Sequence, residues 1–189
     1  FESHFTLLSG LKYHYLDEGK GVLTLMVHGN PSWSFYYRNL IKKLKSDFRA
    51  VAPDHIGCGL SDKPSDKDYS YQFKDRVRDL GQFIDSLNYT GKINIIAHDW
   101  GGAIACAWAG AHADRVNSLV MLNTGAFHLP QTKKFPLALK IIRDSKIGAH
   151  LVLRHNIFSV GASLVGCKIN KMNAELRKLY KLPYDSKAN

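Results

Sequence analysis

Ile95-Ile96-Ala97-His98-Asp99-Trp100-Gly101-Gly102 is the segment of this sequence that decides the fold. The apolar run Ile93–Ala97 predicts a strand buried on both faces of a parallel sheet. The Ala- and Gly-rich run Gly101–Ala111 predicts a closely packed helix. Asp99 stands between them in a small-x-acid-x-small pattern, which resembles the strained nucleophile elbow G-x-S-x-G. A carboxylate in that place can attack carbon and form a covalent ester. From these residues alone, an Asp that caps the helix is an equally good interpretation.

The rest of the first two thirds of the chain repeats this alternation of strand and helix. Two further helices are predicted from apolar residues at helical spacing, at 37–44 and 73–87. Four further strands are predicted at Leu11–Leu16, Val22–Val27, Phe48–Ala52 and Val116–Leu122. The sequence therefore predicts the α/β class, with a mostly parallel sheet and helices on both of its faces.

The charge is distributed unevenly along the 189 residues. Residues 1–128 hold 14 Lys and Arg against 13 Asp and Glu, whereas residues 129–189 hold 12 against 3. Beyond residue 129 the sequence predicts two amphipathic, basic helices, Leu137–Ile142 and Ile147–Leu153, and no further buried strand. We therefore predict a core over 1–128 and part of a helical cap over 129–189. The basic residues form no tight run, which indicates solvated helix faces and no nucleic-acid partner.

Composition excludes several other classes of protein. No apolar run reaches the length of about 18 residues that an integral membrane helix needs. The chain opens Phe1-Glu2-Ser3-His4 without the features of a signal peptide. Three scattered cysteines, Cys58, Cys106 and Cys167, favour neither a disulfide framework nor a zinc site. We therefore expect a cytoplasmic protein with no bound metal.

Three motifs carry a resemblance to a known family. They are HGNPSWSFYYR at His28–Arg38, PDHIGCGLSDKP at Pro53–Pro64 and AHDWGG at Ala97–Gly102. In this order and spacing they resemble the α/β-hydrolase superfamily and, within it, the haloalkane dehalogenases. Asp-Trp after the elbow histidine also occurs in epoxide hydrolases, but Asn30 is typical of dehalogenases. The longer string HGNPSWSFYYRNL is most similar to the dehalogenase subfamily that includes the β-lactone decarboxylases of olefin biosynthesis.

The resemblance implies a role for three residues. Asp99 is the expected nucleophile, and the Asn30 amide and Trp100 indole are expected to bind the leaving halide. Such donors suit an anion that leaves in an apolar pocket, because they carry no proton that they could lose to it. The alkyl-enzyme ester would then be hydrolysed by a water that a histidine activates. The resemblance implies a small hydrophobic substrate and no cofactor.

The sequence departs from the family pattern in its acid and its base. Some members place the catalytic acid directly after the strand that here ends at Leu122, but this chain has Asn123 there. We therefore expect both the acid and the catalytic histidine beyond Asn189, in a protein of which this chain is the front part. Asp54 and His55 are interpreted as structural. No histidine after Asp99 is assigned as the base; these are His112, His128, His150 and His155.

Three alternatives stay open at this point. An epoxide hydrolase would use the same Asp99 but needs cap tyrosines, for which Tyr180 and Tyr184 stand in no matching motif. A β-lactone decarboxylase would use Asp99, Asn30 and Trp100 on a long-chain lactone. The third is a non-catalytic module that binds anionic surfaces through the basic residues after 129. The preferred substrate and the oligomeric state do not follow from the sequence.

Overall fold

The computed structural model of this chain describes residues 1–126, 137–167 and 169–184. The chain divides into two compact units, Phe1–Phe127 and His128–Asn189. The first unit contains the sheet and the elbow around Asp99. The second unit, in its described part, consists of helices.

A six-stranded sheet forms the centre of the first unit, with the strand order β1-β2-β4-β3-β5-β6. Its strands are β1 (Ser3–Leu8), β2 (Leu11–Glu18), β3 (Val22–Val27), β4 (Phe48–Pro53), β5 (Ile93–His98) and β6 (Val116–Leu122). Neighbouring strands among β4, β3, β5 and β6 pair in parallel. Strand β2 pairs antiparallel with both of its neighbours, β1 and β4. Val27 of β3 pairs with Ala97 of β5, so the turns that follow these two strands meet at one edge of the sheet.

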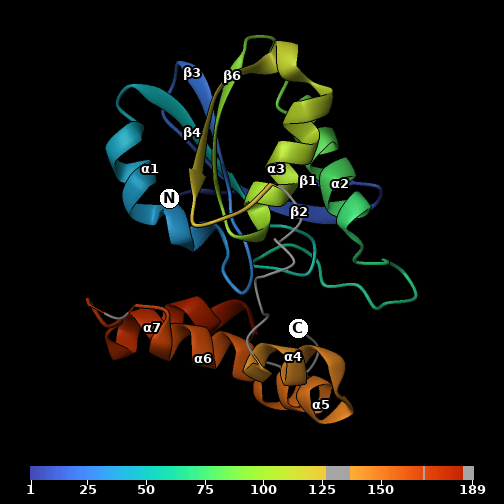
Figure 1. The fold of residues 1–189 in the computed structure, drawn as a ribbon. Coiled ribbons are helices and arrows are strands. Elements are labelled where there is room, and N and C mark those ends of the chain that lie inside the picture. Colours follow the sequence, from blue (N-terminus) through green and yellow to red (C-terminus); the bar gives the residue numbers. More distant parts are fainter. Residues whose placement is uncertain (127–136, 168, 185–189) are drawn as a thin grey trace. The chain divides into compact units, whose positions relative to one another are not determined.

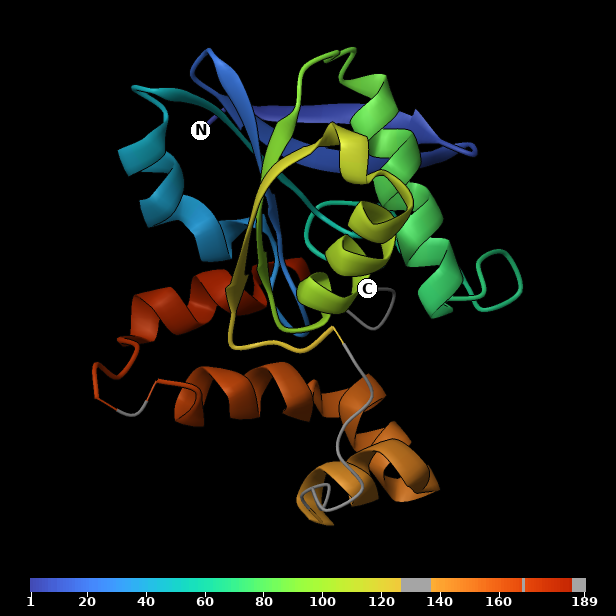
Figure 2. The same ribbon diagram turned by 45° about the horizontal axis from the view of Figure 1, so that its top comes forward.

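Helices cover both faces of this sheet, which confirms the predicted α/β class (Figures 1 and 2). On one face, the 3-10 turn η1 (Ser34–Tyr37) and α1 (Arg38–Leu44) pack on Met26 and its neighbours. On the other face, α2 (Phe73–Ser86) and α3 (Trp100–Ala111) pack on Leu23, Leu25 and Val27. Successive residues of β3 therefore enter different clusters, as the two-residue period of a strand requires.

Two buried histidines join the turn after β3 to the loop after β4. The backbone N–H of His55 donates to Nε2 of His28 at 3.1 Å, so His28 carries its proton on Nδ1 and donates it to the Gly29 carbonyl oxygen at 3.0 Å. His55 Nε2 in turn donates to the His28 carbonyl oxygen at 3.1 Å. Burial lowers the pKa of both imidazoles, that of His55 strongly, and each ring is neutral in this arrangement.

The buried carboxylate of Asp54 ties the same loop to the rest of the unit. It accepts hydrogen bonds from His14 Nδ1 at 2.7 Å, from the Ser34 N–H at 2.6 Å and from the Leu60 N–H at 2.9 Å. These donors belong to β2, to η1 and to the loop itself. A buried carboxylate needs such a set of donors, and Asp54 is therefore occupied in holding three segments together.

The second unit contains two more helices than the sequence predicted. Its helices are α4 (Leu137–Asp144), α5 (Lys146–His155), α6 (Ile157–Val165) and α7 (Ala174–Lys181), followed by the 3-10 turn η3 (Leu182–Tyr184). Ser145 caps α5 by accepting from the Gly148 N–H, and Asn173 caps α7 by accepting from the Leu176 N–H. Across the described parts of both units, no helix has the length and apolar character that crossing a membrane requires.

The neutral pair His28–His55 makes the stability of the first unit depend on pH. Unfolded histidines bind protons as the pH falls through about 6.5, whereas the buried rings, whose pKa is lowered, do not. The free energy of unfolding should therefore be largest above pH 7 and fall between pH 7.5 and 5, by at most about 2 kcal/mol per histidine. Urea titrations of the intact protein at both pH values would measure this loss.

A matched pair of variants separates this effect from other titrations. His55→Gln keeps a donor for the His28 carbonyl oxygen but cannot titrate, so the loss of stability between pH 7.5 and 5 should shrink. His112→Gln, at an exposed position, should leave that loss unchanged. An equal loss in wild type and His55→Gln would contradict the prediction.

Candidate active site

Asp99 lies at a sharp turn between β5 and α3, as the elbow pattern predicted. Its backbone has φ 52° and ψ −131°, a conformation that costs a non-glycine residue free energy. Two hydrogen bonds to its carbonyl oxygen hold this backbone in place, from the Gly102 N–H at 2.9 Å and from Thr124 Oγ1 at 2.5 Å. The Asp99 side chain accepts no hydrogen bond from the first turn of α3, so it does not act as a helix cap.

The turn after β3 approaches the elbow so closely that a side chain has no room at Gly29. A Cβ built there would lie 2.3 Å from Oδ2 of Asp99 and 2.7 Å from the Trp100 nitrogen. A Cβ at Gly101 would meet the Val27 carbonyl oxygen at 2.3 Å. Glycine at these two positions allows the backbones of the two turns to come into contact.

This contact places a backbone donor on the carboxylate. The Asn30 N–H donates to Oδ2 of Asp99 at 2.9 Å. The other carboxylate oxygen, Oδ1, accepts no hydrogen bond from the residues that the structure describes. One oxygen of Asp99 is thus held and the other is available to attack, which is the arrangement that a carboxylate nucleophile needs.

The two expected anion donors are residues next to Asp99, Asn30 through its N–H bond to the carboxylate and Trp100 as the following residue of the chain. Asn30 is exposed and belongs to the turn after β3, and Trp100 begins α3 with 55% of its surface exposed. The ring of Phe73, the first residue of α2, lies 6.4 Å from the Trp100 ring. The structure therefore brings the three residues named from the sequence to one edge of the sheet. Their catalytic and anion-binding roles stay predictions.

Two residues near Asp99 were not identified from the sequence. Thr124 follows β6 and bonds to the Asp99 carbonyl oxygen, and only the pairing of β5 with β6 brings it there. Tyr36 of η1 stacks on His98 with ring centroids 4.6 Å apart. Burial lowers the pKa of His98, which favours a neutral ring beside Asp99.

The histidines that follow Asp99 in sequence have separate positions. His112 Nδ1 lies 2.9 Å from the Trp108 carbonyl oxygen, at the far end of α3 from Asp99. His150 and His155 belong to α5 in the second unit, and His128 lies outside the described residues. Among the residues with described positions, no cluster of His, Cys, Asp and Glu could hold a metal ion.

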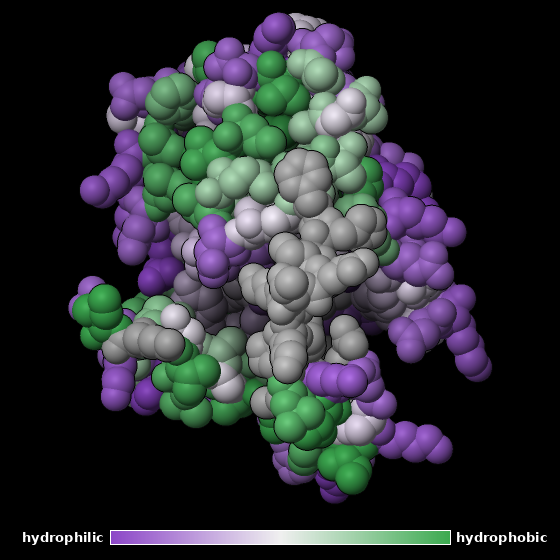
Figure 3. All heavy atoms as spheres, viewed as in Figure 1, coloured by the Kyte–Doolittle hydropathy of each residue, from purple (hydrophilic) through white to green (hydrophobic). Residues whose placement is uncertain are grey.

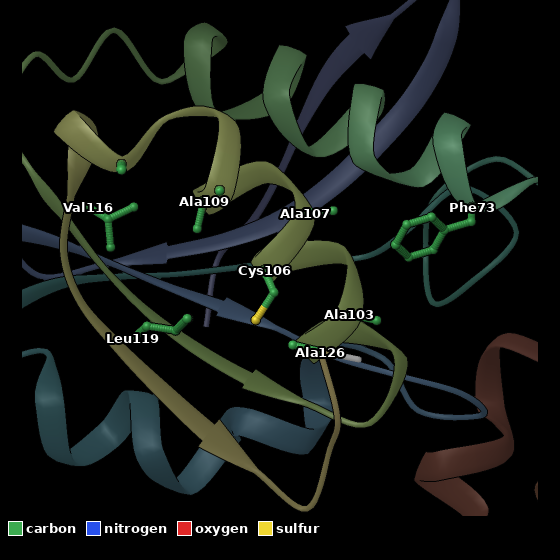
Figure 4. A pocket seen from close by; sticks show the side chains of 10 residues that line it. Phe73, Ala103, Cys106, Ala107, Ala109, Val116, Leu119 and Ala126 are labelled. Atoms are coloured by element: carbon green, nitrogen blue, oxygen red, sulfur yellow. The ribbon is translucent and has the colours of Figure 1, made fainter. Parts of the chain in front are cut away.

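A shallow apolar groove lies beside this site, between α3 and β6 (Figure 4). It has a volume of about 630 Å³, and neither Asp99, Asn30 nor Trp100 lines it. The neighbouring strand β6 exposes Leu119, Val120, Met121 and Leu122. Figure 3 shows the hydrophobic side chains that gather on this face of the first unit. The groove is therefore separate from the carboxylate and is not the candidate active site.

Comparisons with known proteins agree with this geometry. The α/β hydrolase fold family matches residues 24–144. The chain is 51% identical to a cis-3-alkyl-4-alkyloxetan-2-one decarboxylase of Shewanella oneidensis, over all of this chain and 59% of that protein. It is 39% identical to haloalkane dehalogenase 2 of Mycobacterium tuberculosis, over 84% of this chain and 54% of the relative.

The similarity extends to solved structures. The haloalkane dehalogenase DatA of Agrobacterium tumefaciens C58 superposes with a TM-score of 0.87 at 23% identity, over 99% of this chain and 64% of that one. At this identity the likeness concerns the fold. The matched region spans 59% and 54% of the length of the two curated relatives named above. With the family matched over most of the chain and the elbow in place, the chain belongs to the α/β hydrolase fold family.

Proposed function

We propose that the intact protein is an enzyme in which Asp99 attacks an alkyl carbon and displaces an anionic leaving group. The observation that carries the proposal is the Asp99 carboxylate: its Oδ2 accepts a hydrogen bond from the Asn30 N–H, and its Oδ1 accepts none from the described residues. Relatives in Shewanella oneidensis and Xanthomonas campestris, 51% and 41% identical, bear the name cis-3-alkyl-4-alkyloxetan-2-one decarboxylase. They favour a dialkyl β-lactone as the substrate, a small hydrophobic molecule.

The first step opens the lactone ring. Oδ1 of Asp99 attacks the saturated ring carbon that is bonded to the ring oxygen, and the bond between this carbon and the ring oxygen breaks. The electron pair goes to the ring oxygen, so the leaving group is a carboxylate that stays attached to the substrate. The Asn30 amide and the Trp100 indole N–H are the donors that would solvate this new negative charge.

The second step releases the alkene. The bond between the substrate and its carboxylate breaks, CO₂ leaves, and the electron pair forms the carbon–carbon double bond. At the same time the ester bond to Asp99 breaks and returns its carboxylate. The Asn30 N–H, already on Oδ2, stabilises the regained charge. This sequence of steps consumes neither water nor a proton.

Haloalkane dehalogenation is the second candidate, as first expected from the sequence. It would begin with the same attack, with a halide as the leaving group between Asn30 and Trp100. The similarity to haloalkane dehalogenase 2 favours it. Its ester would be cleaved by water, for which the acid and histidine expected beyond Asn189 are needed. Epoxide opening is disfavoured, because it creates an alkoxide that requires a proton and not a pair of anion donors.

The second unit and the location of the protein also belong to this proposal. We propose that residues 129–189 are part of a helical cap. The basic character of this segment is assigned to solvated helix faces. A salt-dependent association of the intact protein with anionic vesicles would instead support the binding module as the function. The three free cysteines support a cytoplasmic location.

The nucleophile can be trapped. In the intact protein with its base histidine replaced, a reactive primary alkyl halide should leave an alkyl adduct, because the ester can then no longer be hydrolysed efficiently, and the added mass should lie on the peptide that contains Asp99. Asp99→Asn should abolish the adduct, because an amide oxygen is a far weaker nucleophile. Asp114→Asn, in the 3-10 turn η2 (Ala113–Arg115), is the matched control and should label like wild type. Intact-protein mass spectrometry and peptide mapping would measure both, and labelling of Asp99→Asn would rule out the assignment.

The anion donors can be tested by rate. Asn30→Ala and Trp100→Phe should each lower kcat/KM by about 10²–10³, the usual effect of removing one donor from a developing anion. Trp108→Phe, at a buried tryptophan further along α3, should leave kcat/KM near wild type. Gas chromatography of the alkene from a cis-3,4-dialkyl oxetan-2-one, and halide release from a haloalkane, would measure both candidate activities. Near-normal rates in both donor variants would refute the anion pair.

A further inference from the structure

The side chain of Asn30 can turn either of two faces to a leaving anion. Its amide carries an acceptor, Oδ1, at one end and a donor, Nδ2, at the other, and the two ends have nearly the same size. Only the donor end stabilises an anion, because the oxygen would repel it. The backbone N–H of Asn30 is already used on Asp99. The orientation of the amide therefore depends on the hydrogen bonds of the side chain itself.

Cys58 is the residue that contacts this amide. Its Sγ lies 3.9 Å from Oδ1 of Asn30, at the long end of the range for a thiol donor. Within the described part of the chain, no other side chain is hydrogen-bonded to the Asn30 amide. With Oδ1 on the thiol, Nδ2 occupies the opposite end of the amide.

The loop that carries Cys58 holds the thiol in a fixed position. The Cys58 N–H donates to the His55 carbonyl oxygen at 2.8 Å, and the Ser61 N–H donates to the Cys58 carbonyl oxygen at 3.2 Å. The same loop is fastened to buried Asp54 through the Leu60 N–H. Cys58 itself is only 7% exposed. A buried side chain on so constrained a loop loses little further freedom when it donates to Asn30.

Resting on the proposed function, we infer that Cys58 is a positioning residue that keeps the Asn30 amide turned with Nδ2 toward the leaving anion. If the amide rotated by half a turn, the S–H···O contact would be lost and Nδ2 of Asn30 would face the Cys58 sulfur, which is a weak acceptor. It would also present Oδ1 to the anion. Cys58 thus acts through Asn30 and touches neither the substrate nor Asp99 in this role.

The test measures anion binding, which does not depend on turnover. Bromide should quench part of the tryptophan fluorescence of the intact protein in a saturable manner, because the Trp100 indole is one of the two proposed donors. Cys58→Val keeps a similar volume but removes the donor, and its bromide dissociation constant should rise about two- to tenfold, the effect of one lost hydrogen bond. Cys106→Val, at the half-buried thiol of α3, is the matched control and should bind like wild type.

A double-mutant cycle separates positioning from packing. In an Asn30→Ala background, Cys58→Val should change the dissociation constant no further, because the amide that it orients is gone. Independent, additive effects of the two substitutions would overturn the inference, as would wild-type affinity in Cys58→Val. If wild type binds no bromide in a saturable manner, the proposed anion site itself fails. If wild type binds and Cys58→Val binds equally well, only the positioning role is lost.

Discussion

The close approach of two backbones at the end of the sheet is the constraint on which the rest of the site depends. The turn after β3 touches the elbow after β5, with no space for a Cβ at Gly29. Because β3 and β5 are paired in parallel, their carboxyl ends arrive together, and the strained backbone of Asp99 completes the contact. The hydrogen bond from the Asn30 N–H to the carboxylate follows from this approach.

This contact can hold Asp99 in position only if both turns are rigid. Hydrogen bonds between buried polar side chains and the backbone make them rigid. His28 and His55 exchange hydrogen bonds between the turn after β3 and the loop after β4, while Asp54 joins that loop to β2 and η1. Buried polar groups are costly unless satisfied. Several such groups lie close to the two turns at Asp99. Hydrogen bonds, and not apolar packing alone, therefore fix the positions of these turns.

The sequence predicted those parts of the fold that a local pattern determines. Buried parallel strands such as β3 and β5 are continuous apolar runs, and α2 shows its apolar residues at helical spacing. The strand β1 was missed because it is an edge strand, largely exposed, with polar residues such as Ser3 and His4. Pairing with β2, a tertiary event, makes it a strand.

The candidate site shows the same division. Asp99, Asn30 and Trp100 stand in short motifs and could be named from the sequence. Thr124 could not, because its role depends on β6 lying next to β5, and no local pattern around it differs from that of an ordinary turn. The contact of Cys58 with Asn30 likewise joins residues from two separate loops. Motifs therefore name the candidate reactive groups, and the sheet topology determines which groups hold them in place.

The arrangement around Asp99 is compatible with both of the proposed reactions. The first step is common: a carboxylate oxygen attacks carbon, and donors receive an anion. A halide leaves the substrate entirely, so the ester must then be hydrolysed by water. A lactone carboxylate remains attached one carbon away from the ester carbon, where the loss of CO₂ can expel Asp99 without water. In the proposed function, Asp99 and its two donors thus set the bond that breaks first, and the access of water to the ester determines the product. Water access depends on what covers the site and how the substrate fills it, and not on Asp99, Asn30 and Trp100.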